Sequence, residues 1–212
     1  MHSNAASSRP QPEPSLTLYF IPGRSWLPRW LLEELQQPYR LVRLDQTRGD
    51  HKQPPYLAIN VLGKLPALDV DGKVMIETAA ICLYLADRFG MGRLAPALQG
   101  RDRPRYLSLM VHASAALDPM LAERVQGRAT PPEQMGWGTH EQEIHFVGGQ
   151  LDAGPYLFGD TFTAADVMVG GALIWGKLSG VALSPRLEDY VARLMQRPAL
   201  MKLFEEVGGM PA

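Results

Sequence analysis

The sequence predicts an α/β unit of residues 16–90, a linker of residues 91–102 and an all-helical unit of residues 103–212. Two patterns predict this division. The order strand–helix–strand, then strand–strand–helix, fills the first unit, whereas beyond residue 102 only helical periodicity recurs. A strand–helix–strand order favours parallel strands joined by a crossover helix. Residues 1–15 are polar and rich in proline and serine, which indicates a flexible tail.

Apolar runs and turn residues define the elements of the first unit. Residues 16–21 are apolar and aromatic, as in a buried strand, and Trp30 recurs with three leucines at helical spacing. The dipeptide Asp71-Gly72 between two apolar runs is typical of a two-residue hairpin. The expected strands are 16–21, 39–45, 66–70 and 73–77, and the expected helices are 26–36, 56–59 and 77–89. These elements predict a mixed sheet of four strands.

The second unit shows helical patterns throughout. The expected helices span residues 103–126, 132–151, 164–177, 184–195 and 198–207. The clearest helix start is at Thr163, because Asp166 can bond back to the Thr163 amide as in a capping box. Phe162 and Val167 flank this start at the positions of a hydrophobic staple. Apolar residues of the longest helix, such as Met110, Met120 and Leu121, are interpreted as core rather than as pocket lining.

Composition argues against several classes of protein. Of the 212 residues 46% are hydrophobic and 20% are charged, as in an ordinary globular protein. The formal net charge is -1 and no basic block stands out, so neither nucleic acid nor membrane is an expected partner. Cys82 is the one cysteine, which excludes an intrachain disulfide and fits a cytoplasmic location. His140 and His145 are five residues apart, so no metal site is expected there.

Three segments, in this order, resemble the glutathione transferase superfamily and its bacterial members in particular. LTLYFIPGRSWLPRWLLEELQQPY (16–39) resembles the first strand, active-site loop and first helix. HKQPPYLAINVLGKLPALDVDGKVMIETAAICLYLADRF (51–89) resembles the glutathione-binding half, and PYLFGDTFTAADVMVGGAL (155–173) resembles the capping-box segment. The resemblance implies a thioredoxin-like first domain, a helical second domain, a homodimer and a role in detoxification.

The resemblance also implies a group that activates the glutathione thiol in the loop after the first strand. A thiol with a pKa near ~8.5 is little ionised at neutral pH, so the protein must favour the thiolate. Ser25 is the one hydroxyl or thiol of this loop and is the expected donor, although a serine there can equally cap the helix. Arg24 is the other candidate, since its charge can stabilise a thiolate.

The rest of the glutathione site is expected around one proline and one helix start. Pro66 lacks an N–H, and the resemblance implies a cis bond that presents the backbone of Leu65 to the peptide ligand. At the next helix start, free amides and Thr78 can bind the γ-glutamyl carboxylate while Glu77 binds its ammonium group. The alternative is that Pro66 only begins a strand and that Glu77 and Thr78 only cap the helix. Lys64 and His51 are candidates for the glycyl carboxylate.

These residues predict a glutathione transferase that attacks a small hydrophobic electrophile, with glutathione as co-substrate and no metal. Two alternatives belong to other classes. The first is a non-catalytic relative that acts through protein contacts, and the second is a glutathione-dependent peroxidase or thiol oxidoreductase. A cysteine nucleophile is disfavoured because residues 22–26 contain no cysteine and Cys82 lies in an apolar helix, where a buried, inert thiol is expected.

Overall fold

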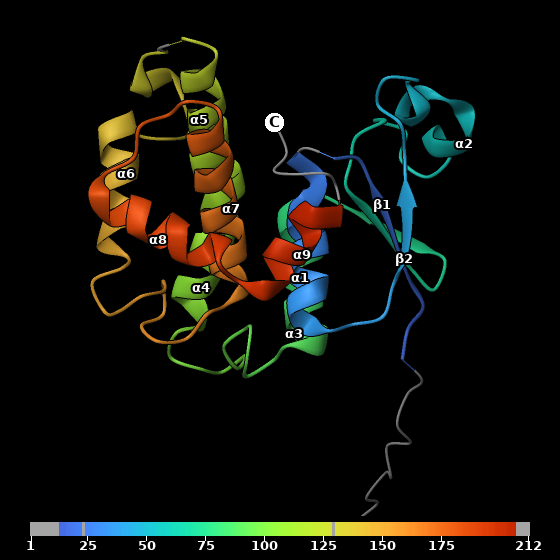
Figure 1. The fold of residues 1–212 in the computed structure, drawn as a ribbon, viewed down its shortest axis with the longest axis horizontal. Helices are drawn as coiled ribbons and strands as arrows, with labels where there is room; N and C mark the ends of the chain where they lie inside the picture. Colours follow the sequence, from blue (N-terminus) through green and yellow to red (C-terminus); the bar gives the residue numbers. More distant parts are fainter. Residues whose placement is uncertain (1–12, 23, 129, 207–212) are drawn as a thin grey trace, which may run out of the picture.

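The computed structural model of the chain describes residues 13–22, 24–128 and 130–206, except for the side chains of Arg24 and Pro132. A sheet forms one side of the molecule, and a group of helices forms the other (Figure 1). The strands are β1 (Leu16–Phe20), β2 (Arg40–Arg43), β3 (Ala67–Val70) and β4 (Lys73–Ile76), in the order β2-β1-β3-β4.

The pairing confirms the predicted mixed sheet. The central strand β1 runs parallel to β2, with Leu18 opposite Leu41, and antiparallel to β3. Strands β3 and β4 form the predicted hairpin, in which Asp71 and Gly72 both have positive φ, 52° and 83°. Two positive φ angles give the turn a twist that matches the strands, which explains why Asp-Gly occurs here.

Helices cover the sheet and separate it from the rest of the chain. This unit contains α1 (Leu27–Leu35), α2 (Pro54–Leu57) and α3 (Thr78–Phe89), with short 3-10 turns at Arg24–Trp26 and Asp50–Lys52. Trp30 and Leu31 of α1 and Leu85 of α3 are fully buried, because the two helices pack side by side on the sheet. The hydrophobic face predicted for each helix is therefore the face that forms the core.

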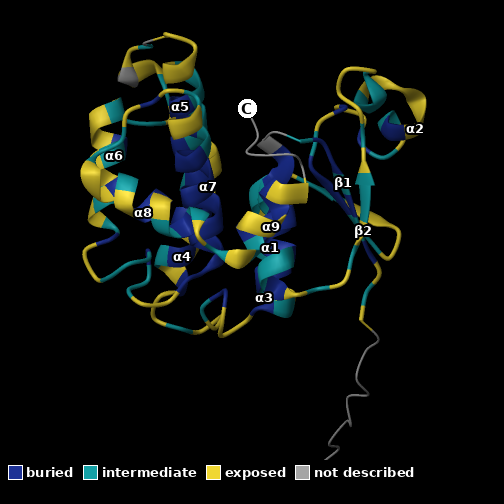
Figure 2. Cartoon of the chain, viewed as in Figure 1, coloured by how far each residue is buried: buried dark blue, intermediate teal, exposed yellow. Residues whose placement is uncertain are grey.

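The remaining chain folds into helices around a nearly completely buried central one. These are α4 (Arg103–His112), a π-helical turn at Ala113–Leu117, α5 (Asp118–Val125), a 3-10 turn at Pro132–Gln134, α6 (His140–Gly149), α7 (Ala164–Leu178), α8 (Pro185–Met195) and α9 (Pro198–Glu206). Figure 2 shows α7 as the buried helix, with exposed residues on α6 and α8 outside it. No helix within the described ranges is both long and apolar enough to cross a bilayer.

One helix expectation is wrong in its first half. Residues 132–151 were expected to be one helix, but α6 begins at His140. Gly136 and Gly138 precede it, and glycine disfavours the helix interior by about 1 kcal/mol relative to alanine. Thr139 then starts α6 with a capping box to Gln142, which the sequence reading did not identify.

The capping box predicted at Thr163 is confirmed, and it is buried. The Asp166 carboxylate accepts hydrogen bonds from the Thr163 amide at 2.8 Å, the Leu157 amide at 2.9 Å and the Tyr190 hydroxyl at 2.9 Å. Burial raises the pKa of the Asp166 carboxyl, while these hydrogen bonds oppose the shift. The motif thus joins the start of α7 to α8 and to the segment before α7.

The last helix fastens the helical unit to the α/β unit. Arg197 donates two hydrogen bonds to the Glu34 carboxylate of α1, at 2.6 and 2.7 Å, and its guanidinium lies over the Phe162 ring. Further pairs join Lys202 to Glu33 and Arg29 to Glu206. These contacts join α9 and Arg197, the residue before it, to α1, next to the loop that follows β1.

Candidate functional site

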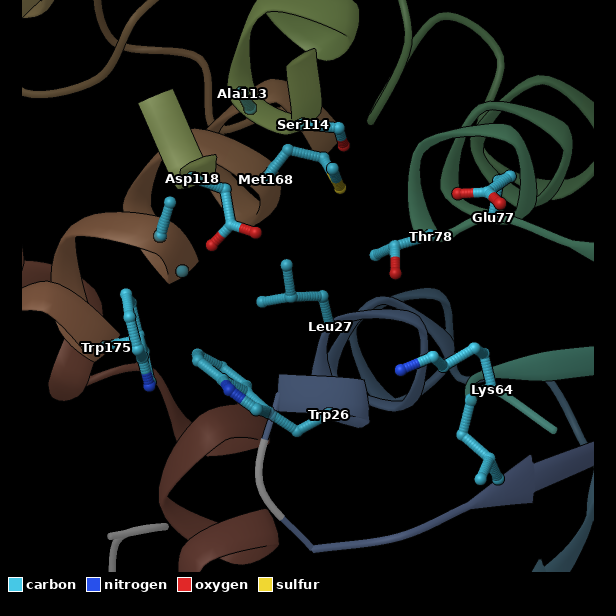
Figure 3. Close-up of a pocket in the computed structure, with 13 residues that line it drawn as sticks. Trp26, Leu27, Lys64, Glu77, Thr78, Ala113, Ser114, Asp118, Met168 and Trp175 are labelled. Atoms are coloured by element: carbon cyan, nitrogen blue, oxygen red, sulfur yellow. The ribbon is translucent and has the colours of Figure 1, made fainter. Parts of the chain in front are cut away.

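A cavity of about 380 Å³ lies where the two units meet. Trp26, Leu27, Lys64, Leu65, Glu77 and Thr78 line it from the α/β unit, and Ala113, Ser114, Asp118, Met168, Gly171, Ala172 and Trp175 line it from the helical unit. Figure 3 shows Glu77, Thr78 and Lys64 on one side of the space and Ser114, Asp118 and Trp175 across from them. The structure therefore brings four of the predicted binding residues to one cavity.

The corner before β3 has the geometry expected for Pro66. The Leu65–Pro66 peptide bond is cis. The carbonyl oxygen of Lys64 accepts hydrogen bonds from the Tyr56 hydroxyl at 2.6 Å and from the Asn60 side-chain amide at 2.9 Å. Both donors are buried, so they fix the backbone directly before Leu65. The sequence reading placed a helical turn here but did not identify this anchoring role, because the contact depends on how the turn packs.

The start of α3 has an unusual backbone. Glu77 occupies the N-cap position with φ 72° and ψ 118°, and its side chain makes no capping hydrogen bond. A non-glycine residue in this region costs about 1–3 kcal/mol and commonly marks a binding site. Glu77 is exposed and lines the cavity together with Thr78. The first-turn amides of α3 and the Thr78 hydroxyl beside a carboxylate can bind both ends of an amino-acid group.

The loop after β1 places Ser25 differently from the other candidates. The Ser25 side chain is 5% exposed and does not line the cavity. Its hydroxyl donates to the Ile21 carbonyl and accepts from the Ile21 amide at 3.1 Å. Ser25 therefore ties the loop back to the end of β1, and it does not cap α1. The side chain of Arg24 lies outside the described residues, and Trp26 of the same turn lines the cavity.

His51 lies apart from this group. It belongs to the 3-10 turn Asp50–Lys52, is half-buried and does not line the cavity, whereas Lys64 does. Of the two predicted partners for a glycyl carboxylate, the structure places Lys64 at the site and His51 away from its walls.

The helical wall of the cavity was not identified from sequence. Ser114 belongs to the π-helical turn, and Asp118 begins α5 one residue before Pro119. Proline lacks the N–H that would continue the helix, and a π-helical turn is one way to accommodate this loss. Gly171 of α7 also lines the cavity. Glycine is needed here because a larger residue would collide with the Leu27 side chain of α1. An interrupted long helix and the Gly170-Gly171 pair were the available sequence signals for this wall.

The residues interpreted as core are confirmed as core. Met110, Met120 and Leu121 are buried and do not line the cavity. Cys82 is completely buried, and burial raises the pKa of its thiol well above the ordinary range, as in a structural cysteine of a protein core. Among the described residues no group of three histidine, cysteine or acidic side chains is arranged to hold a metal ion.

The fold and the site define a two-domain protein, in which a thioredoxin-like domain with a cis-proline corner packs against a helical domain. The glutathione S-transferase N-terminal domain model matches residues 14–87, and the C-terminal domain model matches residues 145–199. Glutathione S-transferase 2 of Saccharomyces cerevisiae is 30% identical over 78% of this chain and 78% of its own length. The chain therefore belongs to the glutathione S-transferase family.

Two other relatives indicate the range of activities in this family. The disulfide-bond oxidoreductase YfcG of Escherichia coli is 26% identical over 87% of this chain and 92% of its own length. A glutathione transferase homologue from Sulfitobacter, solved with bound glutathione, has a TM-score of 0.74 and is 26% identical over 92% of this chain and 99% of that one. Glutathione binding is thus shown in a protein of the same fold.

Proposed function

We propose that the protein binds glutathione in the cavity between its two units and activates the thiol for attack on a small hydrophobic electrophile. The observation that carries this proposal is the joint presence in one cavity of the Leu65 backbone beside the cis bond and of Glu77 and Thr78 at the start of α3. A structural protein with the same fold has no need for a strained acidic residue at an open cavity.

Each part of glutathione has a partner in this arrangement. The backbone of Leu65 pairs with the cysteinyl residue as a strand would. Thr78 and the first amides of α3 bind the γ-glutamyl carboxylate, and Glu77 binds the neighbouring ammonium group. Lys64 binds the glycyl carboxylate, and His51 is a more distant second candidate. The thiol then points towards the turn that contains Arg24 and Trp26.

The thiolate needs a stabilising group, and two candidates come from the loop after β1. A fall of one to two pKa units corresponds to roughly 1.4–2.7 kcal/mol of preferential anion binding. Ser25 can donate to a thiolate only after it gives up its hydrogen bond to Ile21. Because the Ser25 hydroxyl is engaged with Ile21, we favour the positive charge of Arg24 as the group that stabilises the thiolate, with Ser25 as the alternative.

Replacement of each loop residue tests this assignment. We expect Arg24→Met to lower kcat by about tenfold or more in the conjugation of an activated aryl halide, since a charge-assisted interaction contributes roughly 1.5–3 kcal/mol. Ser25→Ala should mainly lower the stability of the loop. Stopped-flow kinetics and calorimetric titration with glutathione separate turnover from affinity. A large loss of kcat in Ser25→Ala with unchanged glutathione affinity would instead assign the donor to Ser25.

A second candidate function is reduction of peroxides or disulfides by the bound thiolate. It is favoured by the similarity to the Escherichia coli relative, which is named a disulfide-bond oxidoreductase. In that reaction two glutathione thiols become one disulfide while a hydroperoxide is reduced to an alcohol and water. The same assay with a hydroperoxide in place of the aryl halide measures the balance of the two activities. Failure of the protein to bind immobilised glutathione would favour the non-catalytic alternative over both.

We also propose that the protein is a homodimer in a reducing, cytoplasmic compartment. Leu107 and Val111 are 38% and 53% exposed and lie four residues apart, so they form one apolar stripe on α4. Such a stripe is typical of a surface that a partner covers.

We expect Val111→Glu to shift the light-scattering mass towards that of one chain. Met201→Glu, which places the same charge at an exposed residue of α9, is the control and should keep the dimer. If both variants have the same mass as wild type, the stripe on α4 is not the dimer interface.

A further inference from the structure

A second hollow lies next to the cavity between the two units. This hollow has a volume of about 480 Å³ and shares Ser114 and Asp118 with the first one. Pro119, Ala122, Glu123 and Gln126 also line it. These residues recur at spacings of three and four, so they lie on one face of α5 and its C-terminal end. From Asp118 to Gln126 the chain rises by about 12 Å, so the residues that line this groove extend about 12 Å along α5.

Two large apolar side chains also line this groove. Met135 and Trp137 come from the segment between α5 and α6, and both are half-buried. This is the segment that was expected to be helical, and it is irregular between the 3-10 turn Pro132–Gln134 and the start of α6 at His140. An aromatic ring and a thioether beside a helix face suit the body of an elongated apolar molecule.

The charged side chains of Glu123 and Arg128 both line the groove, and they differ in their hydrogen bonding. The Glu123 carboxylate accepts hydrogen bonds from both the amide and the hydroxyl of Thr130, so it holds the wall together. Arg128 lines the groove beyond Gln126 and is exposed. Within the described part of the chain, its guanidinium makes no hydrogen bond, ion pair or ring contact. The distal end of the groove therefore offers an uncommitted cation.

We propose that this groove binds the tail of an elongated co-substrate whose reactive end lies beside glutathione and whose far end is a carboxylate. Met135 and Trp137 contact the apolar body, and Arg128 binds the terminal carboxylate, which a guanidinium matches with two parallel hydrogen bonds. The proposal rests on the proposed function in one respect, since it takes the thiolate of glutathione as the reacting group. It adds the chemical class of the second substrate.

Binding of an unreactive tail analogue tests the groove independently of catalysis. The probe is an arylalkanoate of about 12 Å, titrated by calorimetry against the full chain, with the corresponding primary amide and trimethylammonium compounds for comparison. We expect the carboxylate to bind best and Arg128→Met to weaken it by about tenfold, as for a partly exposed charge-assisted pair. The amide should bind wild type and Arg128→Met alike. Arg124→Met is the matched control, because Arg124 is exposed, lies four residues earlier and does not line the groove.

Steady-state kinetics then test whether the groove binds the co-substrate during the reaction. The electrophiles compared share one reactive group and differ in the length of their tails. A long carboxylate-tailed electrophile should have a lower KM than a short one in wild type, and Arg128→Met should remove that advantage without changing kcat. Trp137→Ala should raise KM for every long electrophile but not for the short one. Equal effects of Arg128→Met and Arg124→Met, or preferred binding of the trimethylammonium compound, would overturn the proposal. Normal conjugation of the short electrophile in that case would leave the proposed function intact.

Discussion

Asp166→Ala is expected to destabilise the protein by about 3–5 kcal/mol, because it leaves buried donors without an acceptor. The amides of Leu157 and Thr163 and the hydroxyl of Tyr190 all donate to this carboxylate, which is completely buried. Each unsatisfied buried group costs about 1–3 kcal/mol, and loss of the helix cap adds about 1 kcal/mol. For a chain of this size the loss corresponds to a fall in melting temperature of roughly 6–20 °C.

The second capping box of the chain provides the matched control. Gln142 makes the same backward hydrogen bond to the Thr139 amide, at 2.8 Å, but on the exposed surface of α6. Since water replaces a lost partner there, Gln142→Ala should cost no more than about 1 kcal/mol. Urea denaturation followed by circular dichroism compares both variants with wild type. If the two variants lose similar amounts of unfolding free energy, burial does not increase the contribution of the Asp166 capping box to stability.

Glu77→Ala is expected to weaken glutathione binding by about 10- to 100-fold, the equivalent of one charge-assisted hydrogen bond of roughly 1.5–3 kcal/mol. The carboxylate of Glu77 lies at the edge of the cavity, where it can meet the ammonium group of the γ-glutamyl residue (Figure 3). Glu77→Gln, which keeps the shape and removes the charge, should lose a similar amount. Isothermal titration with glutathione measures both affinities.

The backbone at Glu77 gives this prediction an independent check on stability. Alanine at φ 72° keeps the unfavourable conformation, whereas glycine adopts it freely. Glu77→Gly should therefore bind glutathione as weakly as Glu77→Ala but unfold at a higher denaturant concentration. If Glu77→Ala and Glu77→Gly bind glutathione as tightly as wild type, Glu77 has no part in the site and the proposed orientation of the ligand is wrong.

The α/β half of the site could be predicted because its signals are local. The residues of the proline corner, the hairpin and the start of α3 all lie in one segment of 15 residues, from Lys64 to Thr78. Strand pairing through Asp71-Gly72 then brings the two ends of this short segment to the same edge of the sheet. A chain segment that turns back on itself fixes which of its residues meet, so the pattern was sufficient to place Lys64, Leu65, Glu77 and Thr78 together.

The helical half of the site could not be predicted in the same way. Ser114 and Asp118 lie about 60 residues before Trp175, and they meet the α/β unit through the packing of α7 on α1 and of α3 on α7, α4 and the π-helical turn. Ser25 gives the opposite lesson. Its position in the loop and its residue type both suited a thiolate donor, but its hydroxyl is hydrogen-bonded to Ile21 and the residue does not line the cavity.

The sequence by itself determined the mixed sheet, the Asp71-Gly72 hairpin and the capping box at Asp166, since each depends on residues that are neighbours along the chain. Only the tertiary structure decided the direction of the Ser25 hydroxyl, the irregular course of the segment before α6 and the groove that ends at Arg128. Periodicity and capping specify an element and its buried face. The shape of a cavity depends on how close two such faces approach, and that distance is set by side chains far apart in the sequence.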